Sequence, residues 1–367
     1  MRILNQKELP GRGSSPRSGL QAPVLDEIMY PKVTVSVVYY NSMSKLDLVT
    51  MGLKSLRELD YPNYEVILVD NGSADGTYKF LTNSPLASSF KVIRSERNTY
   101  WAGGNNLAFR SSSPGSRYYL LVNPDAVVEP WALRELVERM EAEPKVGACQ
   151  GQIRRGYPRN SLDVGRFLGE NGWIFDPARF MDIKREYLIT YPAGALTLVR
   201  GDFPRRRGFM FRELPIMGFD DNAFGIELYM NGYTVKYYPI QTGYHEVSAF
   251  TSPGYKDFYS LTCSFLFLLC TNSRYGGLHQ IYFLSNYLRE HFRRNALRKA
   301  KADPSRFTKA LALARELAKV WGEKLDIYRA PYVEVPESVF LLDLISSELR
   351  RRVLKRMRLR LVTPVQG

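Results

Sequence analysis

Three segments place acids, amides and a histidine where they could act on a phosphorylated ligand. In the first, the apolar run Tyr118–Val122 ends at Asn123-Pro124-Asp125. A carboxylate beside an amide oxygen suits a hard cation such as Mg²⁺ or Mn²⁺, which protein oxygens share with substrate phosphates. Pro124 restricts the backbone of Asn123 and fixes the turn. For this segment alone, a turn in which Asp125 only caps the following helix is an equally good interpretation.

The second and third segments carry the acids and the histidine of the C-terminal half. Asp220 and Asp221 precede the helical run Phe224–Met230, where they are either an N-cap with a neighbouring surface acid or a presented general base. His245 follows the strand-like run Tyr233–Ile240. A single histidine is more often structural than a ligand, so the case for His245 depends on its neighbours in the fold.

The elements that must position these side chains alternate between strand and helix. The apolar runs that predict strands are Val33–Tyr39, Glu65–Val69, Lys91–Arg94, Tyr118–Val122 and Leu188–Val199. Helical spacing covers Leu46–Leu59 and Trp131–Glu141. This order predicts an α/β fold with a doubly wound, mostly parallel sheet, in which ligands bind at the carboxyl ends of the strands. Tyr40, Asp70 and Asn71 stand at such ends.

The segment Asn98–Asn106 reads NTYWAGGNN and lies between two predicted strands. Its pair Gly103-Gly104 allows close approach of the backbone to a ligand, and the flanking amides can hydrogen-bond ribose or phosphate oxygens. Alone, the pair is more typical of a plain loop. We expect a loop here that contacts the ligand.

Seven segments in order resemble the inverting family 2 glycosyltransferases of GT-A fold, especially their rhamnosyltransferase-like branch. They are VSVVYYNS from Val35, YPNYEVILVDNGSADGT from Tyr61, NTYWAGGNN from Asn98, LLVNPDAVVEP from Leu120, YPAGALTLVRGDF from Tyr191, GFDDNAFGIELYMNGY from Gly218 and YHEVSAF from Tyr244. The resemblance spans about residues 33–250. It implies a GT-A domain over 31–250, after a lead-in at 1–30 and before a helical basic extension at 251–367.

The resemblance also implies roles for individual residues. Asp221 would be the catalytic base, with Asp220 second, and Asp125 and His245 would hold Mg²⁺ or Mn²⁺ against the diphosphate. The nucleoside diphosphate sugar would be contacted by Tyr40, Asp70, Asn71, Asn98, Gly103, Gly104, Asn105 and Asn123. The implied reaction is the inverting transfer of a hexosyl or deoxyhexosyl group to an acceptor hydroxyl, on a lipid-linked or cell-surface glycan.

Some positions depart from the family pattern, and other functions remain open. Tyr100 stands where the family commonly has glycine, and Ala223 where it has a second acid. The donor sugar therefore does not follow from the resemblance. A sugar nucleotidyltransferase of related fold is an alternative, although no Walker-type GxxxxGK occurs. A non-catalytic protein that binds nucleotide sugars or membranes is another, and it would make Asp221 dispensable.

Charge is concentrated in the last third of the chain. The net charge is +14, of which 251–367 contribute +11 with 21 basic and 10 acidic residues. Leu349–Arg360 holds seven Lys/Arg around an apolar stripe, a pattern that suits an anionic membrane surface. A solvated or disordered tail is the alternative.

A second basic cluster, Arg205-Arg206-Arg207, is interpreted as a solvated turn. Its functional alternative is the binding of an anionic acceptor. We predict no nucleic-acid binding, because no such motif is visible, and the C-terminal helices offer a surface for an oligomer.

Composition limits the class of protein further. The chain has 367 residues, 45% hydrophobic and 24% charged, which excludes wholesale disorder. Its three cysteines form no disulfide framework, so we expect a cytoplasmic protein, peripheral at the inner face of the cell membrane. The longest apolar stretch, Phe258–Cys270, falls short of the roughly 20 residues of a membrane-spanning helix. We predict no such helix.

Overall fold

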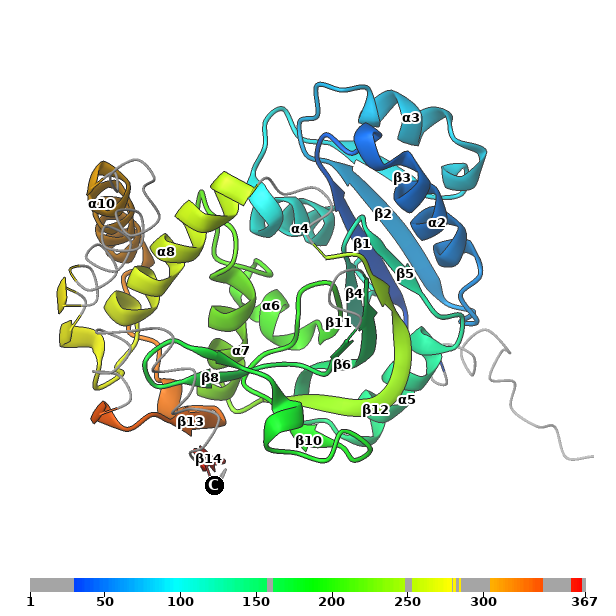
Figure 1. Cartoon of the computed structure of the whole chain (residues 1–367). Coiled ribbons are helices and arrows are strands. Elements are labelled where there is room, and N and C mark those ends of the chain that lie inside the picture. The colour runs from blue at the N-terminus through cyan, green and yellow to red at the C-terminus, as the bar shows by residue number, and fades with distance from the viewer. Residues whose placement is uncertain are drawn as a thin grey trace, which may run out of the picture.

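The computed structural model describes residues 30–156, 161–247, 253–278, 280–281, 284, 304–338 and 358–364. Its centre is a ten-stranded sheet in the order β10-β12-β6-β11-β4-β1-β2-β3, with β5 paired to β12 and β7 to β6 (Figure 1). The strands are β1 (Val33–Tyr39), β2 (Tyr64–Asp70), β3 (Lys91–Arg94), β4 (Tyr118–Val122), β5 (Ala126–Val128), β6 (Val146–Arg155), β7 (Leu162–Asp163), β10 (Tyr187–Leu188), β11 (Leu196–Arg200) and β12 (Thr234–His245).

The first half of the sheet is parallel, as the sequence predicts. β1 pairs with both β2 and β4 in parallel register, and β3 extends the sheet beyond β2. Every residue of β1 and of β4 is buried, because parallel strands are covered on both faces. The four strands predicted in this half are confirmed, and together with the helices on both faces they form the expected GT-A type of α/β fold.

The second half of the sheet is mixed. β11 runs antiparallel to β4 and to β6, whereas β12 runs parallel to β6. The single strand expected over Leu188–Val199 is divided, because β10 ends at Leu188 and β11 begins at Leu196. β12 pairs with β6 from Thr234 to His245, and its last three residues also pair with β5 on their other side. This second pairing places His245 opposite Ala126.

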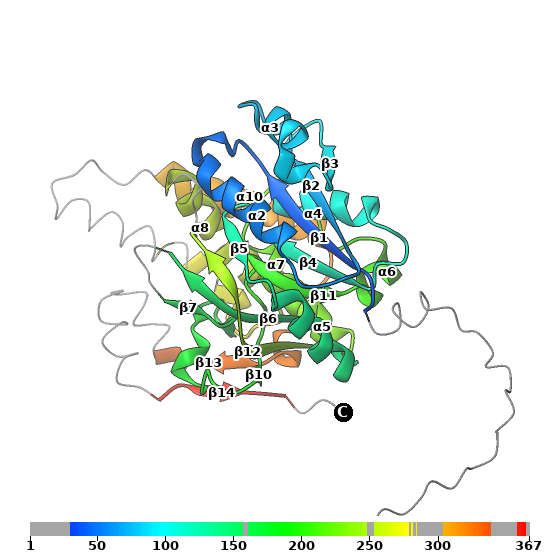
Figure 2. The same ribbon diagram turned by 90° about the vertical axis from the view of Figure 1, so that its right-hand side faces the viewer.

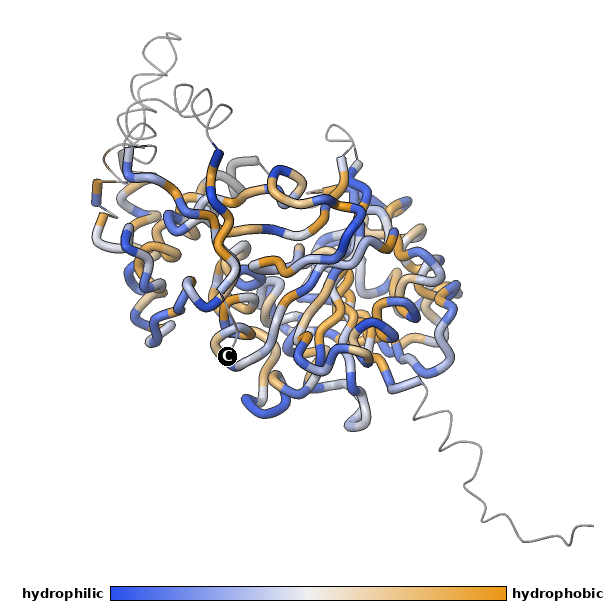
Figure 3. The backbone as a smooth tube through the Cα atoms, turned by 90° about the horizontal axis from the view of Figure 1, so that it is seen from below, coloured by the Kyte–Doolittle hydropathy of each residue, from blue (hydrophilic) through white to orange (hydrophobic). Residues whose placement is uncertain are grey.

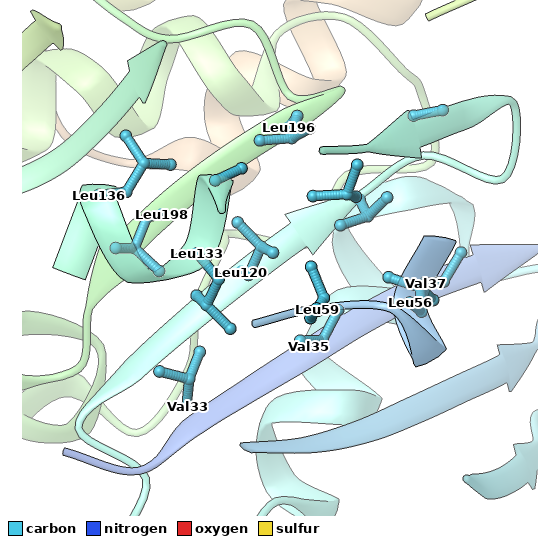
Figure 4. Packing of buried hydrophobic residues seen from close by; sticks show 14 of the residues in the cluster. Val33, Val35, Val37, Leu56, Leu59, Leu120, Leu133, Leu136, Leu196 and Leu198 are labelled. Carbon is cyan, nitrogen blue, oxygen red and sulfur yellow. The ribbon is translucent and has the colours of Figure 1, made fainter. Parts of the chain in front are cut away.

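Helices cover both faces of the sheet. On one face α2 (Leu46–Arg57) and α5 (Ala132–Ala142) pack on Val33, Val35 and Val37, as Figure 4 shows from close by. On the other face lie α4 (Tyr100–Ser111), α6 (Asp202–Arg207) and α7 (Asp220–Met230). α3 (Thr77–Asn83) lies beside α2 near the β2 and β3 edge (Figure 1). Most segments that cross the interior of the molecule are hydrophobic, and most of the outer turns are hydrophilic (Figure 3).

The C-terminal part is helical, as predicted, and also contributes strands. α8 (Pro253–Cys270) packs against α10 (Pro304–Trp321). A second sheet, in the order β14-β13-β8-β9, lies below β12 (Figure 2) and joins segments far apart in the chain. Its strands are β8 (Phe167–Gly169), β9 (Ile174–Phe175), β13 (Tyr332–Glu334) and β14 (Arg360–Val362). The described part of the extension thus shares a core with residues before 250.

Some of the predicted segments lie largely outside the residues that the structure describes. Residues 1–29 of the lead-in and most of Leu349–Arg360 lie outside the described residues. Arg360 belongs to β14 and pairs with Glu334, so this part of the extension is a strand and not the helix expected over 251–367. Within the described residues, no helix is both long and apolar enough to cross a membrane.

Candidate functional site

The carboxyl ends of β1 and β2 bring Tyr40 and Asp70 to one edge of the sheet, because the two strands pair in parallel with Tyr39 opposite Asp70. Tyr40 is 43% exposed, whereas Asp70 is fully buried. Neither carboxylate oxygen of Asp70 accepts a hydrogen bond from the described residues, although Arg94 Nε lies 3.3 Å from Oδ2. A buried carboxylate with open acceptor sites is a ready partner for a ligand N–H or O–H.

Asn71 and Asn98 shape the turn that follows this edge. Oδ1 of Asn71 accepts from Thr99 N at 3.0 Å and from Thr99 Oγ1 at 2.8 Å, and its amide nitrogen donates to Asn98 Oδ1 and to the Tyr100 carbonyl. Oδ1 of Asn98 also accepts from Tyr100 N at 2.8 Å. These bonds hold Tyr100 at a φ of 59°, where the family pattern has glycine. Both amides therefore serve the backbone of this turn.

The loop expected around Gly103-Gly104 is wrong, because these residues lie inside helix α4. The glycines let the helix pack closely: a Cβ on Gly104 would lie 2.5 Å from Val38 Cγ1, and one on Gly103 2.5 Å from Thr99 Cβ. Asn105 is buried and bonds Ser36 Oγ and the Trp101 carbonyl. The signal mistaken for a ligand loop was a close contact between helix and sheet.

Asn123, Asp125 and His245 meet where β4, β5 and β12 come together. His245 Nε2 lies 3.1 Å from Asp125 Oδ1 and 3.4 Å from Asn123 Nδ2. Trp101 Nε1 donates to Asn123 Oδ1 at 3.2 Å, which turns the amide nitrogen of Asn123 toward the histidine. The structure therefore brings together the carboxylate and imidazole predicted to hold a cation, from positions 120 residues apart.

These two side chains fit a divalent cation. Asp125 is buried, and its carboxylate oxygen and the imidazole nitrogen of His245 converge within 3.1 Å, a separation that a proton or a cation can bridge. The described residues contain no cluster of three or more His, Cys, Asp or Glu side chains arranged for a metal. Substrate phosphate and water oxygens would then complete the coordination, as is usual for Mg²⁺.

Asp220 and Asp221 open helix α7 and border the same cleft. Oδ1 of Asp220 accepts from Gly218 N at 2.8 Å, while its Oδ2 is buried without a hydrogen-bond partner among the described residues. Burial and then the charge of Asp220 raise the pKa of Asp221 to about 7, against the opposing hydrogen bond from Asn222 N. The carboxylate of Asp221 is therefore basic enough to accept a proton near neutral pH.

A cationic wall faces this carboxylate pair. Asp163 accepts from Arg155 Nη2 at 2.6 Å and from Arg166 Nη1 at 2.5 Å. Burial alone would raise the pKa of Asp163, but the two guanidinium groups lower it to about 2. With both arginines charged, the triad of Arg155, Asp163 and Arg166 carries a net charge of one positive unit.

The cleft that joins these groups has a volume of about 260 Å³. Its lining combines the cation pair, the acid pair and the cationic wall: Trp101, Asn123, Arg155, Asp163, Arg166, Ala193, Gly194, Ala195, Met217, Gly218, Asp220, Asp221, His245 and Val247. Asp125 reaches it through His245. Tyr40, Asp70, Asn71 and Asn98 lie at the neighbouring β1 and β2 edge and are not among the lining residues.

Sequence reasoning missed the cationic wall. Arg155, Asp163 and Arg166 fall in a stretch without clear periodicity, and their only signal was one acid set among the four arginines at 154, 155, 159 and 166. The arginines singled out instead, Arg205-Arg206-Arg207, are not in the cleft lining. Arg207 pairs inside the fold with Glu227 at 2.7 Å, so neither a solvated turn nor an acceptor grip describes this residue.

Part of the chain is similar in sequence to known glycosyltransferases. Residues 34–202 match the sequence model described as Glycosyl transferase family 2. Poly-beta-1,6-N-acetyl-D-glucosamine synthase of Staphylococcus epidermidis is 26% identical over 191 residues, which are 51% of this chain and 44% of the relative. The synthase of the same name from Staphylococcus aureus is 24% identical over 217 residues, 57% of this chain and 48% of the relative. The chain thus spans under half the length of these relatives.

Solved structures provide more distant neighbours. S. aureus TarS 1-349 in complex with UDP-GlcNAc is 18% identical, with a TM-score of 0.49, over 79% of this chain and 83% of that one. The mannosyltransferase PcManGT from Pyrobaculum calidifontis, in complex with GDP-Man and Mn²⁺, is 19% identical with a TM-score of 0.47, over 89% of this chain and 84% of that one.

Proposed function

Because residues 34–202 form a glycosyltransferase family 2 domain, we propose that the protein transfers one sugar from a nucleoside diphosphate sugar to an acceptor hydroxyl with inversion at the anomeric carbon. The observation that carries the proposal is the cleft itself. It combines a carboxylate whose pKa is about 7 with a carboxylate and imidazole pair suited to a cation. Inverting transfer requires one base and one means of stabilising the leaving diphosphate.

Asp221 is the proposed base. It takes the proton of the acceptor hydroxyl as the hydroxyl oxygen attacks the anomeric carbon, and the bond from that carbon to the diphosphate oxygen breaks on the opposite side. Tyr191 and Cys263 are electrostatic neighbours of Asp221, and neither carries a charge near pH 7 because burial raises both pKa values. Asp220 is the neighbour that keeps Asp221 basic, because its negative charge raises the pKa of Asp221 after burial.

Asp125 and His245 are the proposed ligands of Mg²⁺ or Mn²⁺. When bound, the cation would supply positive charge to the departing nucleoside diphosphate. Arg155 and Arg166 supply fixed positive charge on their own wall of the cleft, and Asp163 holds both guanidinium groups in place. Trp101 orients Asn123 by its hydrogen bond and so fixes the amide that faces His245.

The nucleoside is proposed to lie beside the cleft, at the ends of β1 and β2. Asp70 offers two buried oxygens without hydrogen bonds from the described residues, and Tyr40 offers an exposed ring. Asn71, Asn98, Gly103, Gly104 and Asn105 would act indirectly, by shaping the turn and by letting α4 approach the sheet.

The finer aspects of the proposal concern the substrate and place of action. The protein is proposed to belong to the rhamnosyltransferase-like branch and to use a lipid-linked or cell-surface glycan as acceptor. It is also proposed to act at the inner face of the cell membrane, which its basic C-terminal segment would contact. The +11 charge of 251–367 supports the last of these. Flotation of the full chain with vesicles containing anionic lipid tests it, against a full-length variant in which Arg350, Arg351, Arg352, Lys355 and Arg356 are replaced by Gln. Equal flotation of the two proteins would remove the role of these charges.

A donor screen tests the central proposal. UDP-, GDP- and dTDP-sugars are incubated with the full chain, with Mn²⁺ or with EDTA, and thermal stabilisation and nucleoside diphosphate release are measured. One donor class should stabilise the protein, and Mn²⁺ should increase the effect. The product of that donor, examined by NMR, should carry the inverted anomeric configuration. Binding without release in any acceptor mixture would favour a non-catalytic protein, and a retained configuration would exclude the single-displacement mechanism.

A further inference from the structure

A second hollow opens beside the catalytic cleft, between α8 and the β9 segment. Its volume is about 370 Å³, and most of its lining is apolar. The lining residues are Gly172, Ile174, Met217, Gly218, Asn222, Tyr259, Ser260, Cys263, Ser264 and Phe267. None of these side chains is charged. We call this hollow the α8 groove.

The α8 groove is continuous with the catalytic cleft. Met217 and Gly218 line both, and they directly precede the acid pair of α7. Cys263 Sγ donates to the Met217 carbonyl at 3.3 Å, which ties α8 to the strip between the two hollows. After burial, the charges of Asp220 and Asp221 also raise the pKa of Cys263, so the groove wall is within electrostatic reach of the proposed base.

One face of α8 gives the groove its apolar character. Tyr259, Cys263 and Phe267 follow one another at intervals of four residues and so project from the same side of the helix. Ile174 of β9 also lines the groove and is 59% exposed, so its side chain presents apolar surface there. A molecule lying in the groove would cover both apolar surfaces.

The polar groups of the groove suit a hydrocarbon better than a sugar chain. Ser264 Oγ donates to the Ser260 carbonyl of its own helix, and Asn222 Nδ2 donates to the Gly218 carbonyl at 3.4 Å. Asn222 Oδ1 is a single buried acceptor without a hydrogen-bond partner among the described residues. A carbohydrate would need several hydrogen-bond partners to replace water, whereas an alkyl chain gains free energy from apolar surface alone.

We propose that the α8 groove binds the hydrocarbon chain of an amphiphilic acceptor, whose hydroxyl group is thereby held at Asp221. This rests on the proposed transferase function and narrows its acceptor to molecules with an alkyl or polyprenyl-like part next to the accepting sugar. The groove acts on acceptor affinity, and the nucleoside site at the β1 and β2 edge is independent of it.

The test uses n-octyl β-D-glucopyranoside below its micellar concentration and methyl β-D-glucopyranoside as the matched probe without the chain. Binding of each to the full chain is measured by calorimetry. The octyl glucoside should bind about tenfold or more tightly, because burial of each methylene is favourable. Equal affinities of the two glucosides would overturn the proposal.

Two variant pairs locate the binding site. Ser260 is exposed on α8, so Ser260→Trp should fill the groove and weaken octyl glucoside binding about tenfold, while Ser260→Ala leaves it unchanged. Ile174→Asp should weaken it as well, whereas Val320→Asp, which alters a 73% exposed side chain on α10, should not. If all four variants bind the octyl glucoside equally, the detergent binds elsewhere and the proposal fails.

Measurements of donor binding distinguish the α8 groove proposal from the proposed transferase function. Ser260→Trp should bind the stabilising nucleotide sugar as well as the wild type does. A protein that binds no nucleotide sugar but binds octyl glucoside in the α8 groove would contradict the transferase function alone. A protein that transfers sugar with the same KM for alkyl and methyl glycosides would contradict the groove alone.

Discussion

Two aspartates on the same cleft have opposite electrostatic surroundings. Asp163 is 4% exposed and lies within 2.6 Å of nitrogens from Arg155 and Arg166, and its pKa is lowered to about 2. Asp221 has Asp220 as its neighbour in the chain, and its pKa is raised to about 7. Both side chains lose water, so the difference comes from their charged neighbours.

The contrast shows how one cleft holds a carboxylate that stays ionised beside one that titrates near neutral pH. At Asp163 the guanidinium groups overcome the cost of burial and keep the carboxylate ionised throughout the physiological range. At Asp221 the cost of burial remains, and the charge of Asp220 adds to it. A permanently charged carboxylate positions other groups, whereas one that titrates near pH 7 can exchange a proton with a substrate.

The largest expected effect follows from removal of the proton acceptor. Asp221→Asn keeps the shape of the side chain but cannot take a proton, so kcat should fall about 10³-fold while donor affinity stays within about twofold. Steady-state kinetics and calorimetry with the donor measure the two quantities. Asp220→Asn is the matched control and should lose far less activity, because Asp220 acts only through the pKa of its neighbour. Equal losses in the two variants would assign the base to the pair and not to Asp221.

The second largest effect is expected on stability, when Asp163 is replaced. Asp163→Ala leaves Arg155 and Arg166 buried without their carboxylate, which should lower the free energy of unfolding by about 3 kcal/mol. The control is Asp60→Ala, which breaks the exposed ion pair with Arg134 and should cost less than about 1 kcal/mol. Urea denaturation measures both. A loss at Asp163 no greater than that at Asp60 would mean that the buried triad contributes little net stability.

The sequence singled out Asp221 as a candidate site residue but not Asp163. Asp220, Asp221, Asp125 and His245 were found because each follows or precedes a periodic apolar run, where strand and helix ends carry polar residues. Asp163 was missed because it lies in β7, a strand of two residues that is too short to show a period, and only the pairing of β7 with β6 brings it to Arg155.

The same limit explains the error at Gly103-Gly104. A glycine pair permits both a loop near a ligand and a helix packed closely on a strand, and only the position of Val38 decides between them. The parallel strands were predictable because complete burial requires a continuous apolar run. The second sheet was not, because β8 and β13 are three residues each and lie far apart in the sequence.

The two aspartates should also give opposite dependences of stability on pH. The raised pKa of Asp221 means that its ionisation opposes folding, a penalty that is absent below about pH 4, grows between about pH 4 and 7, and is constant above about pH 7. Asp221→Asn should therefore increase the free energy of unfolding by up to about 4 kcal/mol at pH 8 and by little at pH 4. For Asp163 the sign is reversed: its stabilisation is present above the ordinary carboxyl pKa and is lost as the pH falls through about 2. Urea titrations of each variant over this range measure the difference, and parallel curves would contradict it.

The smallest expected effect is the pH dependence of catalysis. Only ionised Asp221 accepts the acceptor's proton, so kcat/KM should rise with pH, reach half of its plateau near pH 7, and be about tenfold below it at pH 6. Arg166 lowers the pKa of Asp221, so Arg166→Gln should move the midpoint to higher pH. Arg134→Gln alters an exposed ion pair with Asp60 and should leave the midpoint in place. A flat profile between pH 5.5 and 8.5, or an unmoved midpoint in Arg166→Gln, would show that the two sides of the cleft are not electrostatically coupled through this arginine.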